Sequence, residues 1–326
     1  MASLSLLLVV VGVLLSAVRV DAHGIATAMV VFPTGTFYKG YNPSYQYEHP
    51  PPTVVGWSTP NDLQYVIVYG KQTDKYRATP AGAEAPVNAG DVVEIQWTPW
   101  PASHKGPVLD YLANCNGPCE TVDKTKLNFF KIDEVGLVDP AADVWGATQL
   151  MNNNNSWLVR IPTTIAPGNY VLRHEIIALH AAGQPNGAQN YPFCLSIAVS
   201  SNGTDNPSGV PGTKLYKADD PGIHFDLFGP RSGGYQIPGP TLYSGALSVV
   251  QSKGGPIKAT ASGIASLVEA PKLTAVALQQ ADSATGQACD CHSSEVAEEG
   301  RDTSAVGQPA QSFMDSYPIV WKRVTL

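Results

Sequence analysis

Between residues 25 and about 245, short apolar runs alternate with loops rich in glycine, proline and asparagine. The run Val92–Trp97 shows partial alternation of apolar and polar side chains, as expected of a strand with one face in a core. No long stretch has the spacing of an amphipathic helix. About seven short strands without long helices favour an antiparallel β-sandwich. The predicted strands are Ile25–Phe32, Leu63–Tyr69, Val92–Trp97, Leu127–Ile132, Trp157–Ile161, Tyr170–Ile177 and Leu195–Val199.

The beginning of the chain has a different pattern. Residues 1–22 combine the apolar run Leu4–Val18 with small residues at Val20 and Ala22, which is typical of a secretory signal peptide and its cleavage site. The run is shorter than a bilayer span and is followed by charged residues, which disfavours a membrane anchor. Cleavage after Ala22 would make His23 the first residue. An N-terminal histidine can offer both its amine and its imidazole to one metal ion.

The predicted sandwich domain covers residues 23–246. Beyond it the composition shifts to alanine, serine, glycine, threonine and glutamine with no clear period. We therefore expect residues 247–326 to form a low-complexity, mostly disordered tail.

Composition and charge narrow the possible partners. The formal charge is −7 and only 14% of the residues are charged, so nothing basic indicates a nucleic-acid partner, whereas a neutral polymer is compatible. Five cysteines in a secreted chain indicate disulfides and one odd thiol. Cys115 and Cys119 bracket a tight Asn-Gly-Pro loop and are predicted to bond. Asn154 and Asn202 begin glycosylation sequons, which agrees with secretion.

Candidate chemistry concentrates in the stretch Arg173–Cys194, which contains two histidines, a glutamine and a tyrosine between strand-like runs. Nitrogen ligands with a weak axial oxygen suit Cu(II), whereas thiolates suit zinc or iron–sulfur clusters. No Gly-x-Ser-x-Gly elbow or carboxylate pair supports hydrolysis. Each residue also has an ordinary interpretation. His104 could be a solvated loop histidine, and His174 and His180 could be strand histidines with hydrogen-bond partners. Gln189 could be a turn residue, and Tyr191 could simply pack.

Two long motifs and several short ones add a resemblance. The long ones are Ser103–Cys115, which begins Ser-His-Lys-Gly-Pro-Val, and Leu172–His180, which contains Arg-His-Glu-Ile-Ile-Ala-Leu-His. With these, the chain resembles the fungal lytic polysaccharide monooxygenases of auxiliary activity family nine, formerly glycoside hydrolase family sixty-one. The short motifs follow in the family's order: His23-Gly24, Pro52-Thr53, Gly56–Thr59, Ala89–Asp91, Gln189–Pro192 and Ile237–Pro240.

The resemblance implies a copper site with assigned residues. One copper ion would be held by the amine and imidazole of His23, by His104 and by an axial Tyr191. His180 and Gln189 would form hydrogen bonds to the oxygen reactant beside the copper. The implied fold is an immunoglobulin/fibronectin-like antiparallel β-sandwich with long loops and a flat copper-bearing face. Tyr235, and less directly the tyrosines of the loop 33–60, would stack on the substrate there.

The implied function is oxidative cleavage of cellulose or related β-glucans at C1, C4 or both. It needs an external electron donor and O2 or H2O2, and we expect a secreted monomer without a nucleic-acid or membrane partner. The alternative is a non-catalytic secreted protein that binds copper or polysaccharide with the same sandwich.

The cysteines and the tail depart from the family pattern. Cys194 lacks the cysteine that usually pairs with it, because no cysteine occurs between His23 and Asn114. Two interpretations stay open: a tail cysteine, Cys289 or Cys291, bonds to Cys194, or Cys194 behaves as a small buried apolar residue. No cysteine-rich carbohydrate-binding module is recognisable at the end of the chain.

Overall fold

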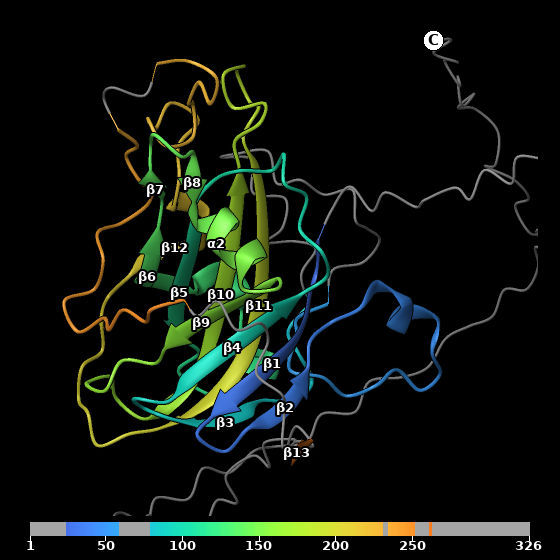
Figure 1. Cartoon of the computed structure of the whole chain (residues 1–326). Coiled ribbons are helices and arrows are strands. Elements are labelled where there is room, and N and C mark those ends of the chain that lie inside the picture. The colour runs from blue at the N-terminus through green and yellow to red at the C-terminus, as the bar shows by residue number, and fades with distance from the viewer. Residues whose placement is uncertain (1–23, 59–78, 231–233, 252–260, 263–326) are drawn as a thin grey trace, which may run out of the picture. The chain divides into compact units, whose positions relative to one another are not determined.

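Two β-sheets, one of five strands and one of six, form the framework of the described chain (Figure 1). The computed structural model describes residues 24–58, 79–230, 234–251 and 261–262. These belong to one compact unit, Met1–Lys272, and a second unit, Leu273–Leu326, lies outside the described residues.

The five-stranded sheet has the order β13 (Ala261–Ser262), β2 (Thr36–Lys39), β1 (Ala26–Phe32), β4 (Val92–Trp97) and β9 (Ser156–Arg160). The six-stranded sheet has the order β12 (Val210–Pro211), β6 (Asn128–Val135), β5 (Val108–Asn114), β10 (Gly168–Ala178), β11 (Gln189–Ser200) and β3 (Ala85–Asn88). Neighbouring strands are antiparallel except β11 with β3 and β13 with β2. The predicted antiparallel sandwich is confirmed.

Short elements fill the connections. β7 (Leu137–Asp139) and β8 (Val144–Trp145) form a hairpin that leads into the helix α2 (Gly146–Asn152). Four 3-10 turns complete the list: Pro43–Tyr47, Cys119–Thr121, Lys124–Lys126 and Gly212–Lys214.

Most predicted strands are present, with shifted ends. Leu195–Val199 is the last part of the much longer β11, and the loop predicted from residue 33 to 60 contains β2 and a 3-10 turn. The strand predicted at Leu63–Tyr69 lies outside the described residues. β5 was not predicted, and its burial explains why: six of its seven residues are buried, so no alternation marks it.

A hydrophobic core fills the space between the two sheets. Met29, Ile95 and Trp157 contribute from the five-stranded sheet, and Leu112 and Ile176 from the six-stranded sheet. All five side chains are almost fully buried, as expected of the inner faces of a sandwich.

The outer face of the six-stranded sheet is buried too. Leu109 and Tyr111 of β5 and Val171 and Ile177 of β10 pack there against a second apolar cluster. The covering residues come from the chain after β8 and β12, among them Trp145, Leu215, Tyr216, Ile223 and Leu227. Long loops therefore act as a third layer, and the end of β10 is held from both sides.

The sandwich continues past the boundary predicted at residue 246. The Leu158 amide donates to Gln251 Oε1 and the Gln251 amide donates back to the Leu158 carbonyl, both at 2.9 Å. β13 pairs with β2 on the opposite edge of the same sheet. Packed structure thus extends beyond 246, and the rest of the predicted division of the chain stays a prediction.

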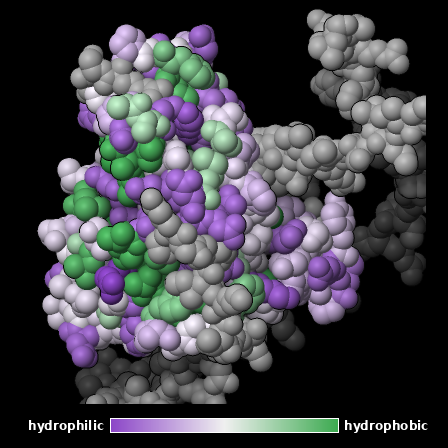
Figure 2. All heavy atoms as spheres, in the orientation of Figure 1, coloured by the Kyte–Doolittle hydropathy of each residue, from purple (hydrophilic) through white to green (hydrophobic). Residues whose placement is uncertain are grey.

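The surface and the cysteines agree with a water-exposed domain. On the described part of the face in Figure 2, small hydrophobic areas are separated by hydrophilic residues.

The predicted disulfide between Cys115 and Cys119 is present. Cys194 packs half-buried against the second cluster; Cys289 and Cys291 lie outside the described residues. No helix within the described ranges has the length and apolar character needed to span a bilayer.

Candidate metal centre

His104 lies on the loop that connects β4 to β5, and this loop is held against the end of β10. The Leu179 amide donates to the Lys105 carbonyl at 2.8 Å. A Cβ added to Gly106 would lie 1.8 Å from the Ile177 carbonyl oxygen. Only glycine permits such a close approach of two backbones, so the sequence His-Lys-Gly fixes His104 beside β10.

An ion pair reinforces this loop from the other side. Lys105 pairs with Asp143, whose second oxygen accepts a hydrogen bond of 2.8 Å from the Trp145 indole. The loop before α2 and the His104 loop are thereby linked.

The hairpin of β10 and β11 brings the other polar residues to the same place. Ala178 pairs with Gln189 at the loop end of the hairpin, so His180 and Gln189 lie close together there. The ring centroids of His104 and His180 are 4.1 Å apart, and those of His104 and Tyr191 are 6.3 Å apart. The Tyr191 hydroxyl donates to Gln189 Oε1 at 2.9 Å. The structure therefore brings His104, His180, Gln189 and Tyr191 together.

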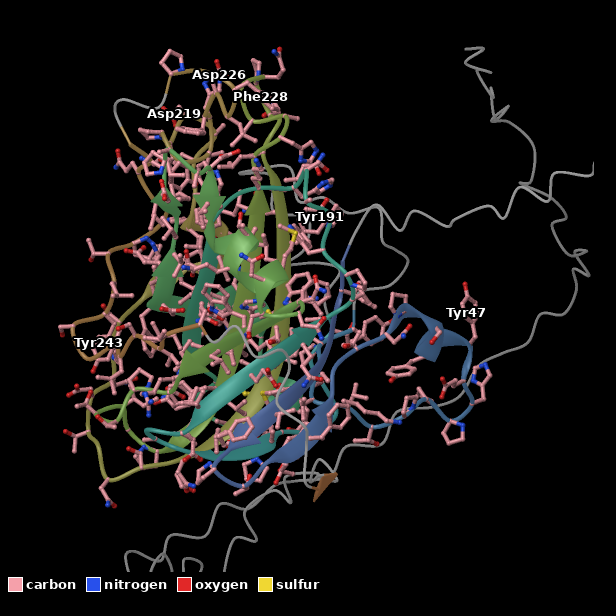
Figure 3. All side chains as sticks on the ribbon, viewed as in Figure 1. Tyr47, Tyr191, Asp219, Asp226, Phe228 and Tyr243 are labelled. Carbon is pink, nitrogen blue, oxygen red and sulfur yellow. A yellow bond between two sulfur atoms is a disulfide. The ribbon has the colours of Figure 1, made fainter. Side chains whose placement is uncertain are left out.

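Tyr191 has the environment of a neutral phenol. Its side chain is buried and its ring packs edge-on against Trp100, with centroids 4.9 Å apart (Figure 3 labels Tyr191). Burial raises the pKa of Tyr191 far above its ordinary value, because removal from water disfavours the phenolate. The hydroxyl is thus a weak neutral oxygen donor at physiological pH.

His104 is oriented by its neighbour in sequence. Ser103 Oγ lies 3.0 Å from His104 Nδ1. A hydrogen bond at one ring nitrogen selects the other for metal binding.

A buried network of hydrogen bonds between charged and polar side chains fixes the β10–β11 hairpin beside these residues. Glu175 accepts hydrogen bonds from Arg173 at 3.1 Å, from Asn190 at 2.6 Å and from Tyr216 at 2.8 Å. Because Asn190 lies between Gln189 and Tyr191, this network fixes the register of the two side chains that reach the site.

His174 does not belong to the site. Its side chain lies in the core between the sheets, where Nδ1 is 2.8 Å from Asp110 Oδ1. The ordinary interpretation, a strand histidine satisfied by a partner, is the one that the structure supports.

His23, the predicted N-terminal ligand, lies outside the described residues. Its neighbour Gly24 packs on the aromatic rings of Trp97 and Trp100. The backbones of Ile25 and Thr98 pair, with the Thr98 amide donating to the Ile25 carbonyl at 3.0 Å. The chain therefore enters the sandwich next to the loop that carries His104.

The arrangement around Tyr235 does not support its predicted place on a substrate face. Its hydroxyl donates to the Gly222 carbonyl at 2.7 Å, and its ring packs against Trp145 and Phe225 at 4.9 and 5.0 Å. The exposed aromatic of this region is Phe228, with 81% of its side chain accessible. The sequence marks Phe228 only as an apolar residue in a loop, which is why it was missed.

Phe228 lies on the side of the molecule that carries His180. Its loop follows Phe225, whose amide donates to the Ala182 carbonyl at 3.1 Å, and Asp226 lies against Gly183 (Figure 3). The loops after β10 and around 226 are thus neighbours.

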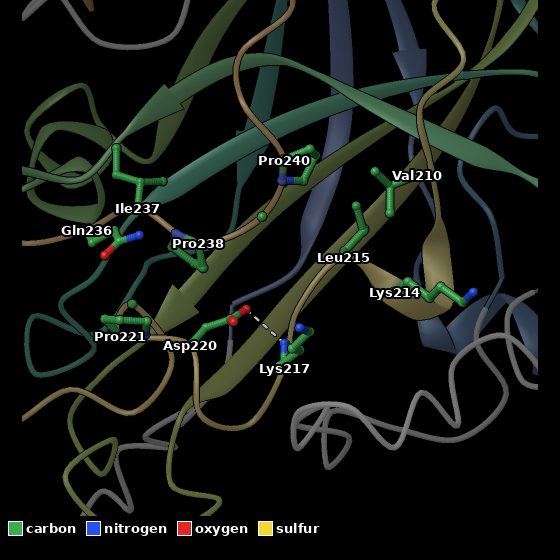
Figure 4. A pocket seen from close by; sticks show the side chains of 12 residues that line it. Val210, Lys214, Leu215, Lys217, Asp220, Pro221, Gln236, Ile237, Pro238 and Pro240 are labelled. Carbon is green, nitrogen blue, oxygen red and sulfur yellow. Dashed lines mark hydrogen bonds between the residues drawn. The ribbon is translucent and has the colours of Figure 1, made fainter.

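A separate groove of about 290 Å³ is lined by Lys214, Lys217, Asp220, Gln236 and prolines 221, 238 and 240 (Figure 4). The Pro238 carbonyl accepts a hydrogen bond from the buried Lys131 at 2.8 Å, so this segment is fixed from below. The groove shares no lining residue with the His104 cluster.

The donors that the structure gathers suit copper. The His104 imidazole and the neutral Tyr191 phenol meet, with the His180 imidazole beside them. Within the described ranges no group of three or more His, Cys, Asp or Glu side chains offers an alternative metal cage. Nitrogen ligands with a weak oxygen are typical of Cu(II), whereas carboxylate cages suit calcium and thiolates suit zinc.

Comparison with known proteins decides the family. The family model of Auxiliary Activity family 9 (formerly GH61) matches residues 23–235. The chain belongs to this family. An AA9 family lytic polysaccharide monooxygenase I from Botryotinia fuckeliana is 55% identical over 260 residues, which cover 77% of this chain and 95% of the relative. As an AA9 lytic polysaccharide monooxygenase, the protein is a copper-dependent enzyme that cleaves polysaccharide oxidatively.

Solved structures agree. The extended catalytic domain of H. jecorina LPMO9A is 49% identical with a TM-score of 0.70, and the match covers 75% of this chain and all of that one. A cellulose-active polysaccharide monooxygenase from M. thermophila is 30% identical with a TM-score of 0.56, covering 69% of this chain and all of that one. The match supports an AA9 sandwich as the fold of this enzyme.

Proposed function

We propose that this AA9 enzyme is secreted after removal of residues 1–22 and cleaves cellulose or a related β-glucan at C1, C4 or both. A single copper ion would be held by the amine and imidazole of His23, by His104 and by Tyr191. The observation that carries the proposal is the convergence of His104, His180, Gln189 and Tyr191 at the loop end of the β10–β11 hairpin.

Ser103, His104 and Tyr191 have separate roles in binding the metal. The Ser103 hydroxyl at His104 Nδ1 leaves metal binding to Nε2. Burial raises the pKa of Tyr191 and keeps its hydroxyl protonated, so it would offer the metal a weak neutral oxygen. Copper, when bound, would accept an electron from an external donor and would activate O2 or H2O2 for oxidation of a glucosyl C–H bond.

The remaining two residues act on the oxygen reactant through hydrogen bonds. Gln189 Oε1 accepts a hydrogen bond from the Tyr191 hydroxyl, so the Gln189 Nε2–H group points away from Tyr191 and can donate to another partner. His180, stacked near His104, provides an imidazole N–H that can donate a hydrogen bond or a proton. Fixed donors around developing charge stabilise the transition state.

The substrate face is proposed around this cluster. A crystalline surface cannot enter a cleft, so its binding depends on exposed aromatic rings and hydrogen bonds. Phe228, and Tyr47 with 77% of its surface accessible, are exposed aromatics of the described chain.

The exposed sequon residues Asn154 and Asn202 are accessible to a glycosylation enzyme.

Mass spectrometry of soluble products from cellulose tests the proposal. The copper-loaded protein beginning at His23 should release oxidised oligosaccharides with ascorbate and none without it, and His104→Ala should release none in either case. Copper binding without oxidised products from cellulose or other β-glucans would instead favour the non-catalytic binding protein.

A further inference from the structure

Trp100, in the loop after β4, contacts two of the proposed copper ligands, His104 and Tyr191. Trp100 is 4% exposed, and its indole Nε1–H donates to the His104 carbonyl at 2.9 Å. Its ring meets the His104 imidazole edge-on at 5.8 Å and the Tyr191 ring at 4.9 Å. One side chain therefore touches two proposed ligands from different elements.

The same ring supports the start of the chain. A Cβ on Gly24 would lie 2.8 Å from Trp100 Cε3 and 3.2 Å from Trp97 Cε3. Gly24 is bonded directly to His23, so the distance between the Trp100 ring and the Gly24 backbone limits where His23 can lie. The pairing of Ile25 with Thr98 holds the following residue in register.

Trp100 is itself held rigidly. Its amide donates to Asn155 Oδ1 at 2.8 Å, and the Trp97 amide donates to the Asn155 carbonyl at 2.8 Å. Asn155 adopts a positive φ of 59° in the turn after α2, a conformation that asparagine tolerates better than most residues. The Trp97 ring adds an edge-on contact at 5.4 Å.

We infer that Trp100 is a positioning residue of the copper site, which sets the spacing between the N-terminal segment, His104 and Tyr191. The two nitrogen-bearing segments are about 80 residues apart in sequence, and this indole bridges them through packing and one hydrogen bond. The inference rests on the proposed function, because the spacing has a consequence only if these residues bind copper.

The test compares Trp100→Phe with Trp57→Phe in the full mature chain. Trp57 is a matched control: it is also buried, and its indole donates a buried hydrogen bond of 2.9 Å to Ser196. Trp100→Phe keeps an aromatic ring but removes the Nε1–H and reduces the contact with Gly24. We expect Cu(II) affinity to fall about 10–100-fold in calorimetry, with altered g and hyperfine values in the Cu(II) EPR spectrum. Trp57→Phe should leave both at wild-type values.

Gly24→Ala provides a second route that leaves the core unchanged. The added methyl pushes the N-terminal segment off the Trp100 ring, so the EPR spectrum should again change and the affinity should fall. Wild-type affinity and spectrum in both Trp100→Phe and Gly24→Ala would overturn the inference, as would an equal effect of Trp57→Phe. A wild-type chain that binds no copper would overturn the proposed function itself, and this inference with it.

Discussion

At the scale of single residues, Gln189 and Tyr191 show how a neighbour determines a role. Tyr191 is buried and its hydroxyl is hydrogen-bonded to Gln189, so the glutamine is oriented without being a proposed ligand. Gln189→Leu should retain copper binding but slow oxidation about 10–100-fold. Copper calorimetry and product mass spectrometry measure the two effects. Gln184→Leu, an exposed glutamine in the same turn, should change neither; loss of copper from Gln189→Leu would contradict the role assigned.

Asp133 makes the stability of the fold depend on pH. It lies directly across from Asp110 on β5 and β6, and burial together with that carboxylate raises the pKa of Asp133 to about 7. The unfolded chain loses this proton near the ordinary pKa of 3.8. The folded state therefore binds more protons between these values, and its stability falls as the pH rises from about 4 to 7.

Asp133→Asn should remove this dependence. Asparagine keeps an acceptor for the Trp157 indole, which donates to Asp133 at 3.2 Å. Relative to the variant, the wild type should lose roughly 2–4 kcal/mol between pH 4 and 7, because each pKa unit corresponds to about 1.4 kcal/mol. Urea unfolding at several pH values measures the difference. Asp219→Asn, at an exposed position, provides the control and should keep the wild-type pH profile. Parallel pH profiles for Asp133→Asn and wild type would refute the raised pKa of Asp133.

Sequence reasoning reached the site residues but not their surroundings. The stretch Arg173–Cys194 was singled out because such polar groups are rare in strand-like runs, whereas His104 was assigned to the metal only through the family resemblance of its motif. The partner of His174 could not be predicted, because Asp110 is 64 residues away and only strand pairing brings them together. The same holds for Trp100, whose contacts with Gly24 and Tyr191 come from three distant segments.

At the scale of elements, the loop before β5 depends on one glycine. Gly106→Ala would place a Cβ 1.8 Å from the Ile177 carbonyl oxygen, so the His104 loop must move away from β10. We expect a loss of roughly 1–3 kcal/mol in the free energy of unfolding and weaker copper binding. Gly82→Ala meets nothing within 4 Å and should be nearly neutral. Wild-type copper affinity in Gly106→Ala would show that the loop does not position His104.

The open edge of β9 depends on the side chain of Gln251. Its amide group makes two hydrogen bonds to the backbone of Leu158, as a neighbouring strand would. Gln251→Ala should lower the free energy of unfolding by about 1–2 kcal/mol, measured by urea unfolding. Gln236→Ala, at an exposed position, should have less than about half that effect, and equal stability of both variants would refute the role of Gln251.

Strands with one buried face were easier to predict than strands with two. β4 has a recognisable pattern because it lies in the five-stranded sheet with intermediate exposure at two positions. β5 is buried on both faces by the core and by the covering loops, which removes the period of two. The extent of the covering layer is a tertiary property, so the sequence pattern alone could not show it.

At the scale of the whole molecule, the sandwich serves to bring distant segments to one edge. The N-terminal segment, the loop after β4 and the turn after β10 meet there, each fixed by backbone pairing. Under the proposed function, the N-terminus created by removal of residues 1–22 would supply a copper ligand. A preceding residue would convert the His23 amine into an amide, whose nitrogen can bind a metal ion only after it loses its proton.

A calorimetric titration of Cu(II) into two forms of the protein therefore tests the account most directly. One form begins at His23, and the other carries a single additional alanine before it. The account predicts tight one-to-one binding by the first form and affinity at least about 10-fold weaker for the second, since one of the three nitrogen ligands is lost. Equal affinity of the two forms would contradict a copper site built on the N-terminal histidine.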